Sequence, residues 1–384
     1  MQLIENTSDL KKLCTELAQH PFVCVDLEFL REHTYFAQLC LIQIANPDVE
    51  AIVDPLAKEL DLQPFFELMQ NPEVIKVFHS GRQDIEIIYQ QGHCIPSPLF
   101  DTQIAASAMG YGESVSYENL VKSLLNINLD KSSRLSDWSK RPLSQEQLQY
   151  AICDVTHLAK MYPLIVEKLQ NKGRLHWIDD ELRNLSSPFL YDVNPYEIWT
   201  KIRHRSHSSK FLTLLRELAC WREKRAMLKN TPRQSLIKDD ILLNICSACP
   251  LSKDDLSAVR GMRTDLARGK IGDEIIEVIQ NVKTMNKDNY VTVYEESNSL
   301  NPDSALLEIL RVVLHIISAQ NNTSPKLIAS DDELKQYCSD TTCDVKFMHG
   351  WRYEIFGNLV EQVKSGTTAI IYNADKHSID VKKI

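Results

Sequence analysis

The sequence predicts an α/β domain that is followed by all-helical segments. Short runs of β-branched and aromatic residues come first and then alternate with helical patterns up to about residue 170, as in α/β proteins. From residue 206 to residue 282, apolar residues recur at helical spacing without a strand-like run. A polar stretch rich in Asn and Ser at 283–303 separates this segment from a further helical set at 304–384.

The first domain, residues 1–170, is expected to begin with a helix over 1–20, for which Ser8 is a candidate N-cap. The expected strands are 22–29, 35–45, 51–54 and 74–78, with an extended lead-in at 96–100. The expected helices are 62–69, 84–90, 102–109, 117–125 and 145–169. Pro163 is expected to kink or restart the last helix, because proline has no amide N–H.

The rest of the chain is expected to divide into four parts. These parts are a connector at 171–205, a helical domain at 206–282, a linker at 283–303 and a second helical domain with a tail at 304–384. Within the linker, 290–294 could form a short strand. In the tail, 368–372 and 379–381 form either a small hairpin or a loose end.

Composition indicates a soluble cytoplasmic protein. The 384 residues are 43% hydrophobic and 25% charged, which is ordinary for a globular chain. The first residues do not resemble a signal peptide, and the most apolar later stretch, 309–317, is too short to cross a bilayer. The ten cysteines are scattered and are expected to be reduced thiols. The pair Cys246 and Cys249 lacks a second pair at zinc-ligand spacing.

Charge is distributed unevenly along the chain. The net charge of −9 argues by itself against a nucleic-acid partner. Residues 1–200, however, contain 16 Lys and Arg against 28 Asp and Glu, whereas residues 201–280 contain 16 against 10. A basic segment beside an acidic one fits a nucleic-acid grip next to a metal site, and a solvated basic helix face is the alternative.

The strand expected at 22–29 carries two acidic residues. Side chains alternate along a strand, so Asp26 and Glu28 project from the same face. Two like charges on an otherwise apolar strand are unfavourable, and a divalent cation is a common compensation because hard cations prefer carboxylate oxygens. The alternative is a pair of solvated carboxylates on an edge strand.

Further acids follow at defined positions. Asp84 opens a helix after a strand and a turn, where the helix dipole alone could explain a carboxylate. Tyr150 and Asp154 share one face of a later helix, and Asp101 is most simply an N-cap. Four carboxylates in this order can hold two divalent cations, which together stabilise the attacking and leaving oxygens of a phosphodiester displacement. The Tyr150 phenol, with an ordinary pKa near 10, is better suited to positioning a water than to acting as the base.

These motifs resemble the DEDD superfamily of 3′→5′ exonucleases in its tyrosine-bearing branch, and more closely the bacterial ribonuclease D family. The resemblance covers about residues 20–170. The matching stretches are 25–29 with Tyr35, 41–45, 79–84, 100–106, 137–139, 141–143 and 150–155. It continues in 214–225 and 256–262, which are similar to the helicase-and-RNase-D C-terminal (HRDC) domain. For 304–384, a second divergent HRDC-like copy is inferred mainly from position, with 349–352 as a weaker match.

The resemblance implies an RNase H-like exonuclease fold and one or two HRDC-type domains. It implies hydrolysis of RNA from the 3′ end, chiefly of tRNA precursors, with release of nucleoside 5′-monophosphates. Two cations, Mg²⁺ or Mn²⁺, are implied. Asp26, Glu28 and Asp154 would ligate the first, Asp26 would also reach the second with Asp84 acting through water, and Tyr150 would orient the attacking water. Leu27 stands where the family usually has Thr, and its side chain is expected to point away from the acids.

Candidate RNA-contacting residues are basic or lie beside the acidic motifs. The run from Lys201 to Lys229 contains nine Lys and Arg and two Glu, and cations of this kind bind phosphates. The aromatic residues within it are expected to belong to the domain core rather than to stack on bases. His79 has about equal claims as a substrate contact and as a core residue. The candidates are His79, Lys131, Lys140, Arg141, Arg203, Arg205, Lys210 and Arg222.

Two alternatives remain open at this point. A DNA-directed 3′→5′ exonuclease would use the same metal site, because a contact to the 2′-OH, which distinguishes RNA, is not identifiable in the sequence. A non-catalytic RNA-binding protein is the alternative of another class, and the complete set of acids argues against it. RNA is the expected partner, no membrane is expected, and a monomer is the default.

Overall fold

The computed structural model describes residues 2–129, 136–206, 208–292, 303–340, 343–375 and 378–384. It divides into two compact units. The first contains Met1–Glu28, Cys40–Leu190 and Asn298–Ile384, and the second contains Phe29–Leu39 and Tyr191–Ser297. Among the residues described, no helix is long and apolar enough to cross a membrane.

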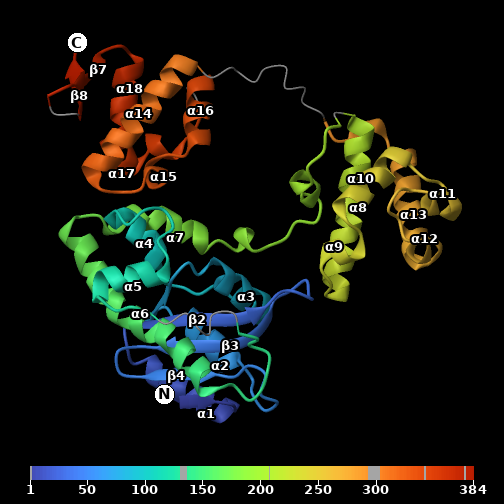
Figure 1. The fold of residues 1–384 in the computed structure, drawn as a ribbon, viewed down its shortest axis with the longest axis horizontal. Helices are drawn as coiled ribbons and strands as arrows, with labels where there is room; N and C mark the ends of the chain where they lie inside the picture. The colour runs from blue at the N-terminus through green and yellow to red at the C-terminus, as the bar shows by residue number, and fades with distance from the viewer. Residues whose placement is uncertain (1, 130–135, 207, 293–302, 341–342, 376–377) are drawn as a thin grey trace. The chain divides into compact units, whose positions relative to one another are not determined.

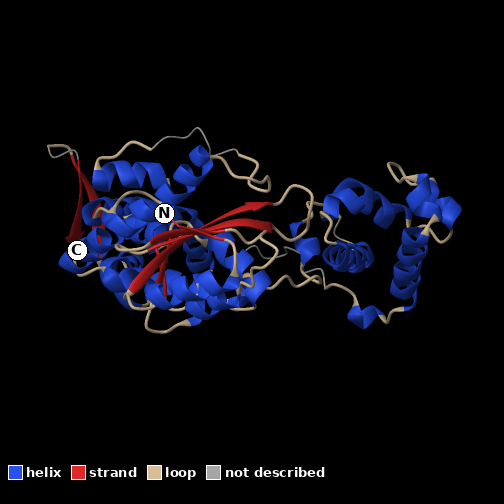
Figure 2. Ribbon diagram, turned by 90° about the horizontal axis from the view of Figure 1, so that it is seen from below, coloured by secondary structure: helices blue, strands red, loops and turns tan. Residues whose placement is uncertain are grey.

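A six-stranded sheet forms the centre of the first unit (Figures 1 and 2). Its strands are β1 (Gln2–Ile4), β2 (Phe22–Leu30), β3 (Gln38–Ala45), β4 (Glu50–Val53), β5 (Ile75–Phe78) and β6 (Leu99–Asp101). The order across the sheet is β1-β4-β3-β2-β5-β6, so β2 lies near its middle. The pairs β1–β4, β2–β5 and β5–β6 are parallel, and β3–β4 is antiparallel.

Helices cover both sides of this sheet (Figure 2). They are α1 (Thr7–Leu17), α2 (Gln63–Gln70), α3 (Arg82–Gly92), α4 (Thr102–Met109), α5 (Tyr117–Leu125) and α6 (Gln145–Asn171). The connector continues through η1 (Leu175–Ile178), α7 (Asp179–Leu185) and η2 (Pro188–Leu190). These elements follow the periodicity of the sequence closely, because each helix buries one apolar face and each central strand is buried on both.

Three local expectations were wrong. Residues 2–4 form a strand beside β4, and the cap of α1 is Asn6, whose side chain accepts from the Asp9 amide, rather than Ser8. Pro163 lies inside one continuous helix, α6, and so does not restart it.

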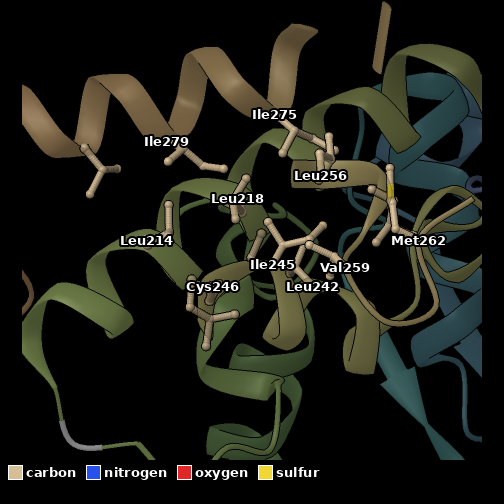
Figure 3. Close-up of a cluster of buried hydrophobic side chains, with 14 of the residues drawn as sticks. Leu214, Leu218, Leu242, Ile245, Cys246, Leu256, Val259, Met262, Ile275 and Ile279 are labelled. Atoms are coloured by element: carbon tan, nitrogen blue, oxygen red, sulfur yellow. The ribbon is translucent and has the colours of Figure 1, made fainter. Parts of the chain in front are cut away.

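The second unit is a helical domain built around one apolar core (Figure 3). Its elements are η3 (Ile198–Lys201), α8 (Ser209–Lys229), α9 (Arg233–Leu236), α10 (Asp239–Ala248), α11 (Lys253–Ser257), α12 (Thr264–Arg268), α13 (Lys270–Thr284) and η4 (Lys287–Asn289). Leu218 of α8, Ile245 of α10 and Ile279 of α13 meet in this core. Phe211 and Trp221 pack against it, which confirms the interpretation that they are core residues.

The segment Phe29–Leu39 belongs to this second unit. The Tyr35 hydroxyl donates to Glu223 Oε1 at 2.5 Å, and the Phe36 amide donates to Asn230 Oδ1 at 3.0 Å. Glu223 is fully buried on α8 and lies 3.4 Å from Arg233. The loop between β2 and β3 is therefore held by a buried carboxylate of the helical domain.

Residues 303–384 complete the first unit. Their elements are α14 (Ser304–Asn321), α15 (Pro325–Ile328), α16 (Asp331–Ser339), η5 (Lys346–Met348), α17 (Gly350–Arg352), the π-helix η6 (Tyr353–Gly357), α18 (Asn358–Lys364), β7 (Thr368–Asn373) and β8 (Ser378–Lys383). The last two strands pair antiparallel, so the tail is a hairpin. Residues 293–294, part of the possible strand in the linker, lie outside the described residues, and Tyr290 follows a 3₁₀ turn instead.

Contacts with the connector and α4 hold this C-terminal part in the first unit. The Arg352 side chain, 2% exposed, donates to Asp180 at 2.6 Å, to Glu181 at 2.8 Å and to the Leu327 carbonyl at 2.8 Å. The rings of Trp177 and Trp351 stack with centroids 4.2 Å apart. Residues 303–384 are therefore joined to the connector by a buried guanidinium and a stacked pair of indoles.

Candidate active site

The strand β2 presents the first two acids. Leu27 is buried between them and faces the opposite side of the sheet, whereas Asp26 and Glu28 are partly exposed on the same side. This confirms the alternation expected from the sequence. Carboxylate oxygens of Asp26, Glu28 and Asp154 all lie within 4.8 Å of one another, so residues 128 positions apart in the chain form one acidic cluster.

The helix α6 supplies the third acid. Ser144 caps this helix in a reciprocal arrangement with Gln147, which fixes where its first turn begins. Tyr150 and Asp154 then lie one turn apart on the same side. Both line a cavity of about 520 Å³ that is also bordered by Asn128. The cavity provides room for a substrate beside the acidic cluster.

Asp84 lies in the first turn of α3 and is 7% exposed. It is not among the three carboxylates within 4.8 Å of one another. The turn before it is fixed by Asp101, which accepts the amides of Ser80 at 3.2 Å and Gly81 at 2.8 Å. Asp101 also accepts the amides of residues 103 and 104 and so caps α4 as expected. Gly81 is required there, because a Cβ would lie 2.5 Å from the Phe78 side chain.

Electrostatics in the site is dominated by buried negative charge. Burial raises the pKa of Asp26 to about 7. Burial and then the charge of Asp26 raise the pKa of Asp154 to about 8. Burial and then the charges of Asp26, Asp154 and Asp84 raise the pKa of Glu28 to about 9. The pKa of Asp84 is also raised, first by burial and then by Asp26 and Asp101.

These shifts show that the acids cannot all be ionised without a positive partner. No Lys or Arg forms an ion pair with any of the four acids among the described residues. A hard divalent cation, which prefers carboxylate oxygens, would supply the missing charge. The donor set therefore fits a divalent cation, and Asp26, Glu28 and Asp154 would hold it.

Two of the predicted RNA contacts, Arg141 and Arg222, direct their guanidinium groups to partners within the protein. Arg141 donates Nε and one terminal nitrogen to the buried carboxylate of Asp54 at 2.6 Å, and its other N–H groups go to carbonyls of residues 40, 138 and 140. All five guanidinium donors are thereby used inside the protein. Arg222 has a fully buried side chain that donates to Asp239 and to the Ile237 carbonyl. Neither guanidinium is available to a phosphate.

The other RNA-contact candidates differ in exposure. Lys140, Arg203, Arg205 and Lys210 are exposed, and Lys140 lies 3.5 Å from Asp137. Lys131 lies outside the described residues. His79 is mostly buried, and its Nδ1 lies 3.0 Å from Thr102 Oγ1. Burial holds the pKa of His79 below its ordinary value, so its imidazole is neutral at pH 7.

One residue near the acids was not predicted from the sequence. Tyr117, the first residue of α5, donates its hydroxyl to the main-chain carbonyl oxygen of Asp154. Its aromatic ring contacts His79 with centroids 5.4 Å apart. A tyrosine that bonds a backbone carbonyl leaves no spacing or charge pattern in the sequence, so no signal could have identified it.

Comparison with known proteins agrees with this site and fold. Residues 1–172 match the 3'-5' exonuclease family model, and residues 211–279 match the HRDC domain model. Escherichia coli RNase D has the same fold, with a TM-score of 0.82 at 24% identity over 95% of this chain and 98% of that chain. The catalytic core of RRP6 from Trypanosoma brucei gives a TM-score of 0.57 over 73% of this chain and 79% of that chain. The fold and the acidic site thus define a 3′→5′ exonuclease.

Curated relatives identify the family. The chain is 40% identical to ribonuclease D of Bartonella henselae over 95% of this chain and 90% of that protein. It is also 40% identical to ribonuclease D of Granulibacter bethesdensis over 95% of this chain and 92% of that protein. The chain belongs to the ribonuclease D family of metal-dependent 3′→5′ exoribonucleases, which confirms the resemblance seen in its motifs.

Proposed function

We propose that the protein trims the 3′ ends of tRNA precursors and releases nucleoside 5′-monophosphates. The observation that carries this proposal is the cluster of Asp26, Glu28 and Asp154, whose oxygens lie within 4.8 Å of one another beside a cavity. Family membership supports RNA as the substrate. In the reaction, water adds to the phosphorus of the last phosphodiester, and the bond to the 3′ oxygen of the preceding nucleotide breaks.

The side chains have distinct proposed roles. Asp26, Glu28 and Asp154 hold one divalent cation, and Asp26 with Asp84 serves a second, each being Mg²⁺ or Mn²⁺. Bound cations of this kind stabilise the negative charge that develops on the attacking and leaving oxygens. Tyr150 lies one turn before Asp154 and borders the cavity, so its phenol can donate a hydrogen bond that orients the attacking water. With an ordinary pKa near 10, a phenol remains a donor at neutral pH.

Exposed cations are proposed to hold the RNA. Lys140 lies in the catalytic part, whereas Arg203, Arg205 and Lys210 lie in the helical domain, and all four are exposed. Phosphate contacts of this kind raise affinity without reading sequence. For His79, the contacts with Thr102 and Tyr117 favour a supporting role. We also propose that residues 304–384 are a divergent second HRDC-like domain and that the protein acts as a monomer in the cytoplasm.

The proposal is tested with a 5′-labelled tRNA precursor that carries a 3′ extension. With Mg²⁺ or Mn²⁺, the wild-type protein should give a ladder that shortens from the 3′ end, and chelator should abolish it. Asp26→Asn should leave the RNA intact, whereas Asp48→Asn, at an exposed aspartate outside the cluster, should behave as wild type. Internal cleavage, or retardation of an intact RNA on a gel, would contradict the proposal. A matched DNA strand tests the choice of nucleic acid.

A further inference from the structure

The main chain at Asp154 receives a hydrogen bond from another helix. Tyr117 begins α5, and the Ser116 side chain caps that helix through the Asn119 amide at 3.3 Å. From this position the Tyr117 hydroxyl donates to the carbonyl oxygen of Asp154 and lies 3.3 Å from the carbonyl oxygen of Cys153. The contact is to the peptide of Asp154 and leaves its carboxylate free for the acidic cluster.

The same turn of α6 carries further side-chain contacts to its carbonyls. His157 Nδ1 lies 2.7 Å from the Cys153 carbonyl oxygen, and Thr156 Oγ1 lies 3.5 Å from it. In an α-helix these carbonyls already accept from amides four residues later. Additional donors that insert into this ladder tilt the peptides and bend the helix. The direction of the backbone in this turn therefore depends on side-chain contacts from α6 itself and on the Tyr117 hydroxyl of α5.

The ring of Tyr117 is itself held in place by the motif that contains Asp84. His79 packs edge-on against it, and His79 Nδ1 lies 3.0 Å from Thr102 Oγ1. The Thr102 hydroxyl donates to the Phe78 carbonyl at 3.1 Å, so it accepts from His79. A continuous series of contacts thus runs from the end of β5 through His79 and Tyr117 to Asp154.

The chemistry of Tyr117 suits this position. A tyrosine phenol is protonated at neutral pH and acts as a donor. Phenylalanine at this position would keep the ring against His79 and remove only the hydrogen bond to the helix.

We propose that Tyr117 is a positioning residue that aims the Asp154 carboxylate at the divalent cation by holding the Asp154 carbonyl. The inference rests on the proposed role of Asp154 as a metal ligand. A hydrogen bond to the Asp154 carbonyl fixes the plane of that peptide. It thereby fixes the direction in which the Asp154 side chain leaves the helix. Metal sites depend on such supporting contacts, because their ligands must be held to within about 0.5 Å.

The test compares Mn²⁺ binding by the full chain, measured by electron paramagnetic resonance without RNA. Tyr117→Phe should bind Mn²⁺ about tenfold more weakly, which is the scale for loss of a supporting contact. Its kcat should fall while KM for RNA stays unchanged. The matched control is Tyr162→Phe, because Tyr162 is a buried tyrosine of α6 whose ring contacts Phe22 and Phe100. The control should bind Mn²⁺ as wild type does.

Asp154→Asn separates this inference from the proposed function. If this variant binds Mn²⁺ as tightly as wild type, the ligand role of Asp154 is wrong, and so is the inference that rests on it. If Asp154→Asn weakens binding, the double variant with Tyr117→Phe should weaken it no further. A full additional loss in the double variant, or wild-type Mn²⁺ binding by Tyr117→Phe alone, overturns the positioning role. A loss in Tyr162→Phe equal to that in Tyr117→Phe would overturn it as well.

A folding control keeps the test decisive. The thermal midpoint and circular dichroism spectrum of Tyr117→Phe are measured first. If this variant does not fold, His79→Phe is used, which keeps an aromatic ring against Tyr117 and removes the bond to Thr102. Weaker Mn²⁺ binding by that variant supports the proposal, and unchanged binding overturns it.

Discussion

Replacing Glu28 with glutamine is expected to stabilise the metal-free protein while abolishing its stabilisation by metal. In the folded protein, burial and three neighbouring carboxylates raise the pKa of Glu28 from 4.5 to about 9. At pH 7 the folded protein therefore holds a proton on Glu28 that the unfolded chain would release, and this uptake lowers the free energy of unfolding. Glutamine has nearly the same shape and does not titrate, so this cost disappears.

The magnitude follows from the shift. A pH of 7 lies about 2.5 units above the ordinary Glu28 pKa of 4.5, and each unit corresponds to about 1.4 kcal/mol, which gives about 3.5 kcal/mol. Glu28 is partly exposed, so solvent screening reduces the expected gain in the free energy of unfolding to about 2 kcal/mol. For a chain of 384 residues, that gain raises Tm by roughly 2–3 °C.

The raised pKa of Glu28 also determines whether the free energy of unfolding rises or falls with pH. The pKa of Glu28 is higher in the folded state, so the folded state binds the proton more tightly. Below about pH 4.5 both states are protonated and the penalty vanishes, and it grows as the pH rises toward 9. Metal-free wild type should therefore lose stability between pH 5 and pH 9, and Glu28→Gln should lose less.

The assay is thermal unfolding in EDTA and in Mn²⁺, at several values between pH 5 and pH 9. Mn²⁺ should raise Tm of the wild type and leave Glu28→Gln almost unchanged, because a ligand that binds only the folded state stabilises it. Glu16→Gln, at an exposed position on α1, serves as the control and should match wild type. A lower Tm for Glu28→Gln than for wild type in EDTA at pH 8, or an identical pH slope, would refute the reasoning.

Three further predictions concern ion pairs and surface cations. Arg141→Ala should lower the free energy of unfolding by about 3 kcal/mol in urea denaturation, because it leaves a buried carboxylate without its cation, and a loss under 1 kcal/mol would contradict this. Arg352→Ala should lower the free energy of unfolding by about 2–4 kcal/mol, since the two acidic partners of Arg352 are partly exposed. It should also make residues 303–384 sensitive to limited proteolysis, and unchanged proteolysis would contradict this prediction. The double variant of Arg203 and Arg205 to Ala should weaken RNA binding and reduce the slope of log affinity against log salt by about 0.7 per lost contact, and an unchanged slope would exclude phosphate contacts there.

The two pairs of residues that make up the acidic site could be predicted from the sequence because the geometry within each pair is local. Alternation along β2 puts Asp26 and Glu28 on one side, and the helical repeat puts Tyr150 and Asp154 on one face of α6. The pattern of strands and helices was likewise readable, since most elements bury one regular apolar face. These local patterns do not show that the pair on β2 meets the pair on α6. That expectation came from the resemblance to the ordered motifs of the family.

The partners of Arg141 and Arg222 within the protein could not be predicted, because the exposure of a side chain depends on the tertiary fold. Arg141 and Arg222 each stand in a basic stretch of sequence, where a solvated cation is the natural expectation. Their partners, Asp54 and Asp239, are 87 and 17 residues away and show no fixed spacing. The contact of Tyr117 could not be predicted for a similar reason. Its partner is a main-chain carbonyl, a group that every residue has.

The anchoring of the loop Phe29–Leu39 has a practical consequence for anyone dissecting this chain. A fragment that ends near residue 205 would keep the loop but lose Glu223 and Asn230, which receive the Tyr35 hydroxyl and the Phe36 amide. Tyr35 and Phe36, seven and eight residues after Glu28, would then lack these partners. Such a fragment would differ from the intact enzyme at the end of the very strand that carries two of its acids, so its activity would not report that of the catalytic part alone.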